Sequence, residues 1–136
     1  WPNAEELNIA PCWCGLTGCL ETWLSGTGFA SDHARVHGGQ LTAIDIIQAM
    51  RAGEPSAMNS FERYMNRLGR ALAQVVNLLD PDCIVLGGGM SNVQEIYPQV
   101  QAAMQAHVFG VQVSTPVRAA AHGDSSGVRG AAWLSR

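Results

Sequence analysis

The sequence contains no lysine, and its eight basic residues are arginines spread singly along 136 residues. A nucleic-acid surface requires clustered basic residues, so scattered arginines in a chain of net charge −3 argue against such a partner. No apolar run approaches the roughly 20 residues that cross a bilayer, so we expect no membrane partner and a cytoplasmic protein. Charged residues make up only 14% of the chain and hydrophobic residues 47%, which predicts one folded domain with a large interior.

The chain is instead rich in cysteine near its start. Cys12, Cys14 and Cys19 lie within the run Cys12-Trp13-Cys14-Gly15-Leu16-Thr17-Gly18-Cys19. Its two glycines bend the backbone, so the three thiolates can converge on one point, and zinc binds such ligands in a tetrahedron. We therefore predict a structural zinc site in which these three cysteines are ligands.

The fourth zinc ligand has to come from outside this loop. His33 and His37 are in range, but each lies on an expected helix, so a histidine upstream of Trp1 is the preferred candidate. Cys83 begins the run Cys83-Ile84-Val85-Leu86, which is typical of a buried strand, and we expect it to be a small core residue. A disulfide framework is the alternative use of four cysteines, but the tight spacing favours metal.

The apolar spacing predicts helices and strands in the order of an α/β layer. Expected helices cover residues 29–37, 43–52, 55–79, 92–107 and 128–134, and expected strands cover 83–86 and 111–119. In the longest helix, Arg63, Arg67 and Arg70 lie off a continuous apolar stripe, which favours a central core helix over a partner-binding coiled coil. Two strands make a poor sheet, so we expect further strands upstream of Trp1 and interpret the chain as part of a longer protein.

Three other features are candidates for contact with a ligand. Glu21 follows Cys19 closely and is placed to accept hydrogen bonds from sugar hydroxyls, although composition alone favours a first-turn glutamate that interacts with the helix dipole. The triplet Gly87-Gly88-Gly89 follows a strand, where ligands bind in open α/β sheets, so a nucleotide contact and a mobile turn are equally open. Asp124 is expected to cap the last helix or to brace the backbone.

Taken in order, these segments resemble the ROK proteins, a family of repressors, open reading frames and sugar kinases. The matching segments are residues 12–21, 25–29, 80–82, 84–89 and 122–132. They cover nearly the whole chain, and the cysteine motif is highly specific. The sequences of residues 87–92 and 122–130 are most similar to those of bacterial fructokinases of this family.

The resemblance implies an α/β fold that is part of an actin-like ATPase (ribonuclease-H-like) domain, helix-rich and carrying a zinc-binding loop. Residues 1–28 would form the zinc and sugar-site loop, and residues 29–136 the helices and strands of the C-terminal α/β domain. It also implies which residues bind what: Cys12, Cys14 and Cys19 the zinc, Glu21 the sugar, and Gly87, Gly88 and Gly89 the adenosine of ATP.

Four family features are absent from this sequence and are expected upstream of Trp1. They are the phosphate-binding Asp-x-Gly-x-Thr segment, the catalytic aspartate, the second glycine-rich loop and the zinc-binding histidine. We therefore expect no catalytic residue within this chain and no activity from the chain alone.

The resemblance implies a kinase that transfers phosphate from ATP, with magnesium, to a hexose. Fructose, giving fructose 6-phosphate, is the leading candidate substrate. A homodimer, or pairing with the missing N-terminal part, is the expected assembly. Two alternatives stay open: the sugar-sensing domain of a ROK repressor, and a zinc-braced interaction module without a ligand.

Overall fold

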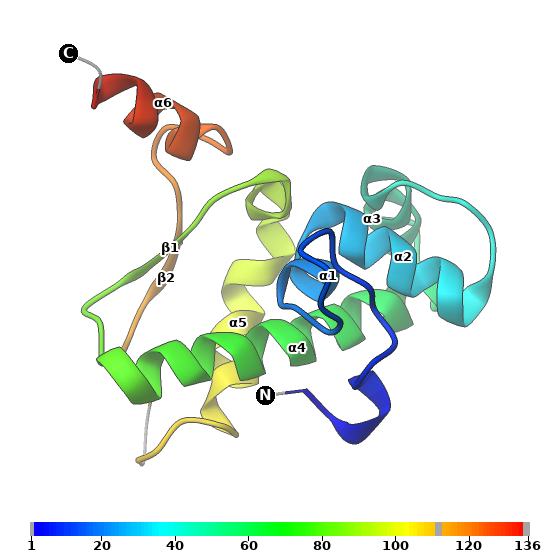
Figure 1. Cartoon of the computed structure of the whole chain (residues 1–136), viewed down its shortest axis with the longest axis horizontal. Coiled ribbons are helices and arrows are strands. Elements are labelled where there is room, and N and C mark those ends of the chain that lie inside the picture. The colour runs from blue at the N-terminus through cyan, green and yellow to red at the C-terminus, as the bar shows by residue number, and fades with distance from the viewer. Residues whose placement is uncertain (1, 111–112, 135–136) are drawn as a thin grey trace.

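A single long helix organises the fold. The computed structural model describes residues 2–110 and 113–134, and its longest element is α4 (Pro55–Leu79), which crosses the middle of the molecule (Figure 1). Pro55 occupies the first turn, where its missing N–H breaks no hydrogen bond. The helix ends at Asp80, whose φ of 44° is left-handed and turns the chain away. The helix expected over residues 55–79 is therefore confirmed at both ends.

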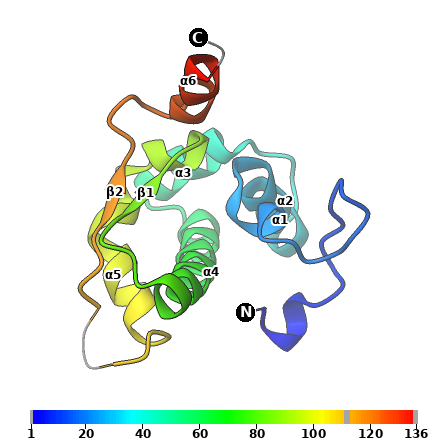
Figure 2. The same ribbon diagram turned by 60° about the vertical axis from the view of Figure 1, so that its left-hand side comes forward.

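The N-terminal elements pack against one side of this helix. The short helix η1 (Ala4–Glu6) leads into the cysteine loop, and α1 (Glu21–Leu24), α2 (Gly26–His37) and α3 (Ala43–Arg51) follow it. Figure 2 shows α1 and α2 on one side of α4, and α5 with the two strands on the other. The cysteine loop lies outermost, beyond α1.

Side-chain caps start two of these helices. Ser25 Oγ accepts a hydrogen bond from the Gly28 N–H at 3.0 Å, so α2 begins at Gly26, earlier than the expected start at Phe29. Residues Gly26, Thr27 and Gly28 are therefore the first turn of α2. Thr42 starts α3 with a reciprocal capping box, and α3 lies close to the expected range 43–52.

The two strands pair in parallel and are shorter than expected. β1 (Ile84–Leu86) lies beside β2 (Val117–Ala119), with Ile84 opposite Val117. Pro116 precedes β2 and has no N–H to donate, but its carbonyl accepts a hydrogen bond from the Ile84 N–H at 2.9 Å. The strand expected over 111–119 includes residues 111–112, which lie outside the described residues.

The expectation of a fully buried strand from Cys83 to Leu86 is wrong. The Cys83 side chain is exposed rather than part of the core, and Val85 is 60% exposed. Alternate residues of a strand point to opposite faces, and only Ile84 and Leu86 pack against the core cluster. Val85 projects from the opposite face, away from the core cluster.

The helix expected over residues 92–107 is broken into three parts. The chain first forms the 3₁₀ turns η2 (Gly89–Asn92) and η3 (Gln94–Ile96) and then α5 (Tyr97–Gln105). Pro98 lies in the first turn of α5, where proline is tolerated, whereas inside a longer helix it would remove a hydrogen bond.

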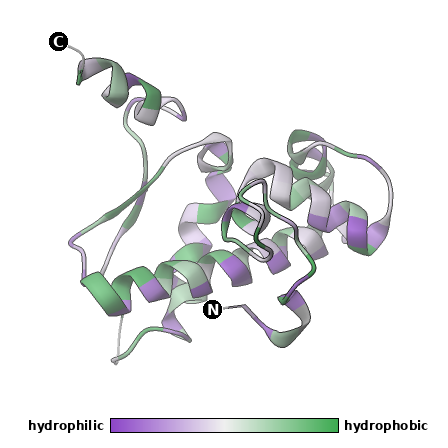
Figure 3. Ribbon diagram, viewed as in Figure 1, coloured by the Kyte–Doolittle hydropathy of each residue, from purple (hydrophilic) through white to green (hydrophobic). Residues whose placement is uncertain are grey.

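The hydrophobic core lies where α4 meets α2, α3 and α5, and Figure 3 shows polar and apolar residues alternating along α4. Its largest fully buried side chains come from elements all around α4: Trp23, Phe29, Ile46, Ile96, Val100 and Met104. A Cβ at Gly69 would lie 2.6 Å from the Ala103 carbonyl carbon, so α4 and α5 touch backbone to backbone.

The C-terminal helix α6 (Ser126–Trp133) stands apart from the other helices (Figures 1 and 2) and lies close to the expected range 128–134. Val128, Trp133 and Leu134 at this end are each at least 75% exposed. No helix within residues 2–110 and 113–134 is long and apolar enough to cross a membrane.

Candidate functional site

The three cysteines of the loop converge as the sequence predicts. Their Sγ atoms all lie within 4.8 Å of one another, and Cys14 Sγ is 3.6 Å from Cys19 Sγ. With Zn–S bonds of about 2.3 Å, the sulfur atoms of a tetrahedral site are about 3.8 Å apart. Gly15 and Gly18 have φ of 86° and 69°, which allows the tight bends. The loop therefore offers three free thiols at distances that suit one zinc ion.

The three thiols also influence each other electrostatically. The Leu16 backbone N–H and the neighbouring thiols lower the pKa of Cys14. Hydrogen bonds with Cys14 and Cys12 raise the pKa of Cys19 to about 11. Cys14 therefore loses its proton more easily than Cys19 does, and a bound cation would favour the thiolate form of its ligands.

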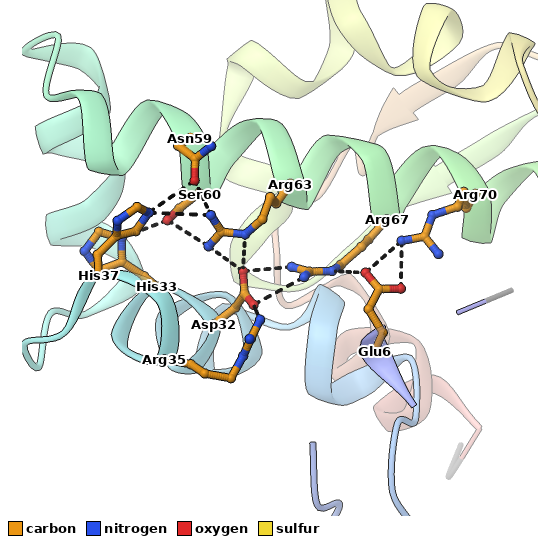
Figure 4. Close-up of polar contacts among 10 residues, drawn as sticks. All are labelled: Glu6, Asp32, His33, Arg35, His37, Asn59, Ser60, Arg63, Arg67 and Arg70. Atoms are coloured by element: carbon orange, nitrogen blue, oxygen red, sulfur yellow. Dashed lines mark hydrogen bonds and ion pairs between the residues drawn. The ribbon is translucent and has the colours of Figure 1, made fainter. Parts of the chain in front are cut away.

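The two histidines considered as a fourth zinc ligand lie elsewhere. His33 Nδ1 is 2.9 Å from Ser60 Oγ, and His37 Nε2 is 3.2 Å from Asn59 Oδ1, so both rings face α4 (Figure 4). Burial first, and then the charges of His37 and Arg63, lower the pKa of His33. Within the described residues, the group arranged to hold a metal consists of the three cysteines alone.

Glu21 and the glycine triplet, which are distant in the sequence, line one hollow of about 450 Å³. Glu21 is exposed at the first position of α1, and the triplet follows β1. A Cβ built on any of Gly87, Gly88 or Gly89 would meet no atom within 4 Å. The absence of side chains here therefore leaves space for a ligand to approach the backbone.

Two further hollows adjoin this one. A hollow of about 360 Å³ lies between the cysteine loop and α2, and because Glu21 lines it too, this carboxylate borders both. A hollow of about 390 Å³ lies on the other side of Gly89, with Ile44, Ile47 and Val93 among its apolar residues. Glu21 and Gly89 thus connect three adjacent spaces.

Asp124 braces the loop that carries the glycine triplet. Its carbonyl accepts a hydrogen bond from the Gly88 N–H at 3.2 Å, and its Oδ2 accepts one from Asn92 Nδ2 at 3.1 Å. Hydrogen bonds from Asn92 and Ser125 lower its pKa. Of the two roles expected for Asp124, the structure gives it the bracing role, because α6 has Ser125 and not Asp124 at its N-cap.

A buried ionic network lies behind the cysteine loop, and the sequence analysis did not predict it (Figure 4). Asp32 of α2, only 3% exposed, accepts hydrogen bonds at 2.8 Å from Arg63 and from Arg67 and pairs also with Arg35. Glu6 of η1, 4% exposed, accepts a hydrogen bond from Arg67 Nε at 2.7 Å and forms an ion pair with Arg70, which also lies on α4.

Ion pairing outweighs burial at both carboxylates of the network. Burial by itself would raise the pKa of Asp32, but the hydrogen bonds from Arg67, Arg63 and Arg35 hold it at about 2. At Glu6 burial would again raise the pKa, but hydrogen bonds lower it overall, and the one from Arg67 has the largest lowering effect. Both groups are therefore ionised at neutral pH.

Two close contacts fix α1, which carries Glu21. The Arg67 Cζ atom lies 4.4 Å from the centre of the Trp23 ring, a cation–π contact. A Cβ at Gly28 would lie 2.6 Å from the Thr22 carbonyl carbon, so α1 and α2 touch through their backbones. The sequence offered one signal for this network, the turn-by-turn spacing of arginines on α4, but nothing in it identified their partners.

Comparison with known proteins places these features in a family context. The ROK family model matches residues 4–136. An N-acetyl-D-glucosamine kinase of Yersinia pseudotuberculosis is 41% identical over 129 residues, which are 95% of this chain and 42% of that protein. A solved ROK family glucokinase from Streptomyces griseus, in complex with glucose and AMPPNP, matches with a TM-score of 0.78 and 27% identity, over 91% of this chain and 46% of that one.

A solved ROK family transcriptional regulator, a homologue of the E. coli MLC protein, is similar as well. It matches with a TM-score of 0.67 and 25% identity, over 84% of this chain and 32% of that one. The chain thus spans less than half the length of each of these proteins.

Proposed function

The chain belongs to the ROK family, and on this premise we propose that it supplies sugar- and nucleotide-binding surfaces of an ATP-dependent hexose kinase. The observation that supports this most is the hollow lined by both Glu21 and the glycine triplet. Phosphoryl transfer requires an acceptor hydroxyl and a nucleotide phosphate to meet in one place, because catalysis rests mainly on positioning and electrostatics.

We assign the two ligands to opposite sides of this hollow. The Glu21 carboxylate would accept hydrogen bonds from sugar hydroxyls and so orient the hexose. Gly87, Gly88 and Gly89 would let the nucleotide approach the backbone. The neighbouring apolar hollow beside Ile47 would take the adenine ring.

The reaction would move the γ-phosphoryl group of ATP to a hexose hydroxyl, with magnesium neutralising charge on the phosphates. An aspartate outside this chain is the expected general base. The part described here therefore binds and orients substrates, and we expect no turnover from the chain alone.

Cys12, Cys14 and Cys19 are proposed to bind a structural zinc, with a histidine from outside this chain as the fourth ligand. Three thiolates and a histidine form a closed site, so the metal would brace the loop beside Glu21 without taking part in the reaction. Metal analysis of the complete protein should find one zinc per chain, and Cys14→Ser should lose most of it. Full zinc content in that variant would remove Cys14 from the ligand set.

The identity of the hexose needs a direct comparison. The resemblance of residues 87–92 and 122–130 to fructokinases favours fructose, but the relatives compared above are named for N-acetylglucosamine and glucose. We therefore rank N-acetylglucosamine first, glucose second and fructose third. Initial rates of ADP formation by the complete protein with each sugar would order them. A clearly higher rate with fructose would contradict this ranking and make fructose the first candidate.

Glu21→Ala in the complete protein tests the proposed function. Losing hydrogen bonds to a charged group should raise the hexose KM about tenfold to a hundredfold, whereas the ATP KM should change little. Glu62→Ala, at an exposed position of α4, is the matched control and should leave both constants unchanged. An unchanged hexose KM in Glu21→Ala would remove this residue from the sugar site.

The sugar-sensing domain of a ROK repressor is the second candidate, supported by the similarity to the solved transcriptional regulator. Calorimetry of the complete protein separates the two. A kinase should bind both a non-hydrolysable ATP analogue and a hexose, and a sensor only the sugar. Assembly as a homodimer, or by pairing with an N-terminal part, stays a prediction that light scattering can test.

A further inference from the structure

We propose that Arg67 is a positioning residue that fixes both ends of the cysteine loop and, through them, sets the place of Glu21 in the sugar site. This inference rests on the proposed function of Glu21. Arg67 lies on α4, and its partners are Glu6, Asp32 and Trp23, so it would act on Glu21 through these neighbours.

The two ends of the loop meet at the same guanidinium group. Before the loop, Glu6 Oε1 accepts a hydrogen bond from Arg67 Nε at 2.7 Å. After the loop, the Trp23 ring lies against the guanidinium, with its centre 4.4 Å from Cζ. Between them the loop itself is closed by backbone hydrogen bonds, including the Gly18 N–H to the Ala10 carbonyl at 2.8 Å. Arg67 thus ties a self-closed loop to α4 at its entry, through the pair with Glu6 that Figure 4 shows, and at its exit through Trp23.

A third contact fixes the guanidinium in turn. Its two terminal nitrogens donate to the two carboxylate oxygens of Asp32 on α2, at 2.8 and 3.3 Å. Such a two-point pair defines orientation as well as distance, because the guanidinium is planar. The side chains of Arg67 and Asp32 are 6% and 1% exposed, so water does not loosen the arrangement.

Glu21 depends on these contacts because α1 is too short to hold itself in place. A single four-residue turn is unstable alone, so its position is set by tertiary packing. Trp23, only 2% exposed, is the one buried side chain of α1, and it is in the same turn as Glu21. A shift of the indole would therefore move the carboxylate, and misplacement of about 1 Å is enough to change a rate a hundredfold.

The arrangement is also one that stability alone would not favour. A buried ion pair is often no more stabilising than apolar residues of the same volume, because both charges lose their hydration. Elsewhere α4 contributes many apolar side chains to the core, among them Leu68 and Met65. The Arg67 guanidinium lies where the cysteine loop and α1 meet α4, and this place fits a residue that sets their orientation.

Arg67→Met in the complete protein tests the proposal. It should raise the hexose KM about tenfold or more while the ATP KM changes less than about twofold. Arg67→Lys keeps the charge without the planar fork and should recover only part of the loss. Glu62→Gln, on the same helix but exposed, should change neither constant.

A double-mutant cycle separates this role from general loosening. If Arg67 acts through Glu21, then Arg67→Met should add little to the hexose KM once Glu21 is alanine. Additive effects would overturn the proposal, as would a normal hexose KM in Arg67→Met when Glu21→Ala raises it. If Glu21→Ala itself has no effect, the proposed function fails first and this inference with it.

Glu6→Gln gives an independent readout if Arg67→Met does not fold. It keeps the shape and hydrogen-bonding ability of the side chain but removes the charge from one end of the loop. A smaller rise in hexose KM, with an unchanged far-ultraviolet spectrum and ATP KM, is the expected result. No rise would overturn the claim that the entry of the loop is positioned through Arg67.

Discussion

The two sides of α4 hold their neighbours by different physical means. Towards α3 and α5 the contacts are apolar, with Ile46, Ile96 and Met104 fully buried. Towards η1, α1 and α2 a buried ionic network is added to apolar contacts such as that of Phe29 with Tyr64, and Asp32 and Arg67 lie at its centre. Apolar contacts are non-directional and tolerate volume-conserving change, whereas paired charges define orientation. The comparison indicates that one side provides stability and the other sets the geometry of the site.

The largest expected effect comes from breaking the ionic side. Asp32→Ala leaves the buried guanidinium of Arg67 without its bidentate partner, so we expect the free energy of unfolding to fall by about 3–5 kcal/mol. Ile96→Val on the apolar side should lower it by only about 1 kcal/mol. Urea unfolding of both variants measures the difference. Similar losses would mean that the network is not a critical element of the fold.

A glycine-to-alanine substitution can be made on each side of α4, at Gly28 and at Gly69. Gly28→Ala would push α1 from α2, and Gly69→Ala would push α5 from α4, because each new Cβ lies 2.6 Å from a carbonyl carbon. Both should lower the free energy of unfolding by about 1–3 kcal/mol. Only Gly28→Ala should also raise the hexose KM of the complete protein. Equal effects on KM would erase the distinction between the two sides.

Acid should weaken the ionic side selectively. The Asp32 carboxyl has a pKa of about 2 in the folded protein, below its ordinary value of 3.8. Between these values the unfolded chain binds a proton that the folded protein does not, so stability falls as pH is lowered from about 4 to about 2, by up to about 2 kcal/mol. Asp32→Asn should flatten this part of the pH profile in urea unfolding, and Ile96→Val should not. An identical profile in Asp32→Asn would assign the acid sensitivity to other groups.

The smallest effect is expected at an exposed ion pair. Arg51 and Glu95 join α3 to η3 at 2.7 Å, and their side chains are 49% and 33% exposed. Water and salt screen such a pair, so Glu95→Gln should change the free energy of unfolding by less than about 1 kcal/mol. Thermal unfolding at low and high salt tests this. A loss as large as that of Asp32→Ala would show that burial does not separate the two kinds of pair.

Local patterns in the sequence predicted the elements that local forces determine. The apolar stripe along residues 55–79 was sufficient for α4, and the apolar spacing over residues 43–52 was sufficient for α3. The glycines of the cysteine loop predicted the convergence of its thiols. Pro98 in the sequence is the signal that the helix expected over 92–107 starts later, because proline is tolerated only in a first turn. The exposed position of Cys83 could not be predicted, because an apolar run does not show how many layers cover a strand.

Long-range pairing was beyond the reach of the sequence pattern. Asp32 and Glu6 find Arg67 only because α2 and η1 pack across α4, and no periodicity marks such partners. The placement of Glu21 beside the glycine triplet has the same origin, since it depends on how the chain returns after β1. For these residues the family resemblance supplied roles that spacing alone did not.

The threefold contact of Arg67 restricts how this region can diverge among relatives. A replacement that suits one of its partners disturbs the other two, so Glu6, Trp23 and Asp32 should change together with it or stay as they are. Positions on the opposite side of α4 can drift one at a time, as long as volume is kept. Evolution should therefore leave correlated substitutions on one side of this helix and independent ones on the other.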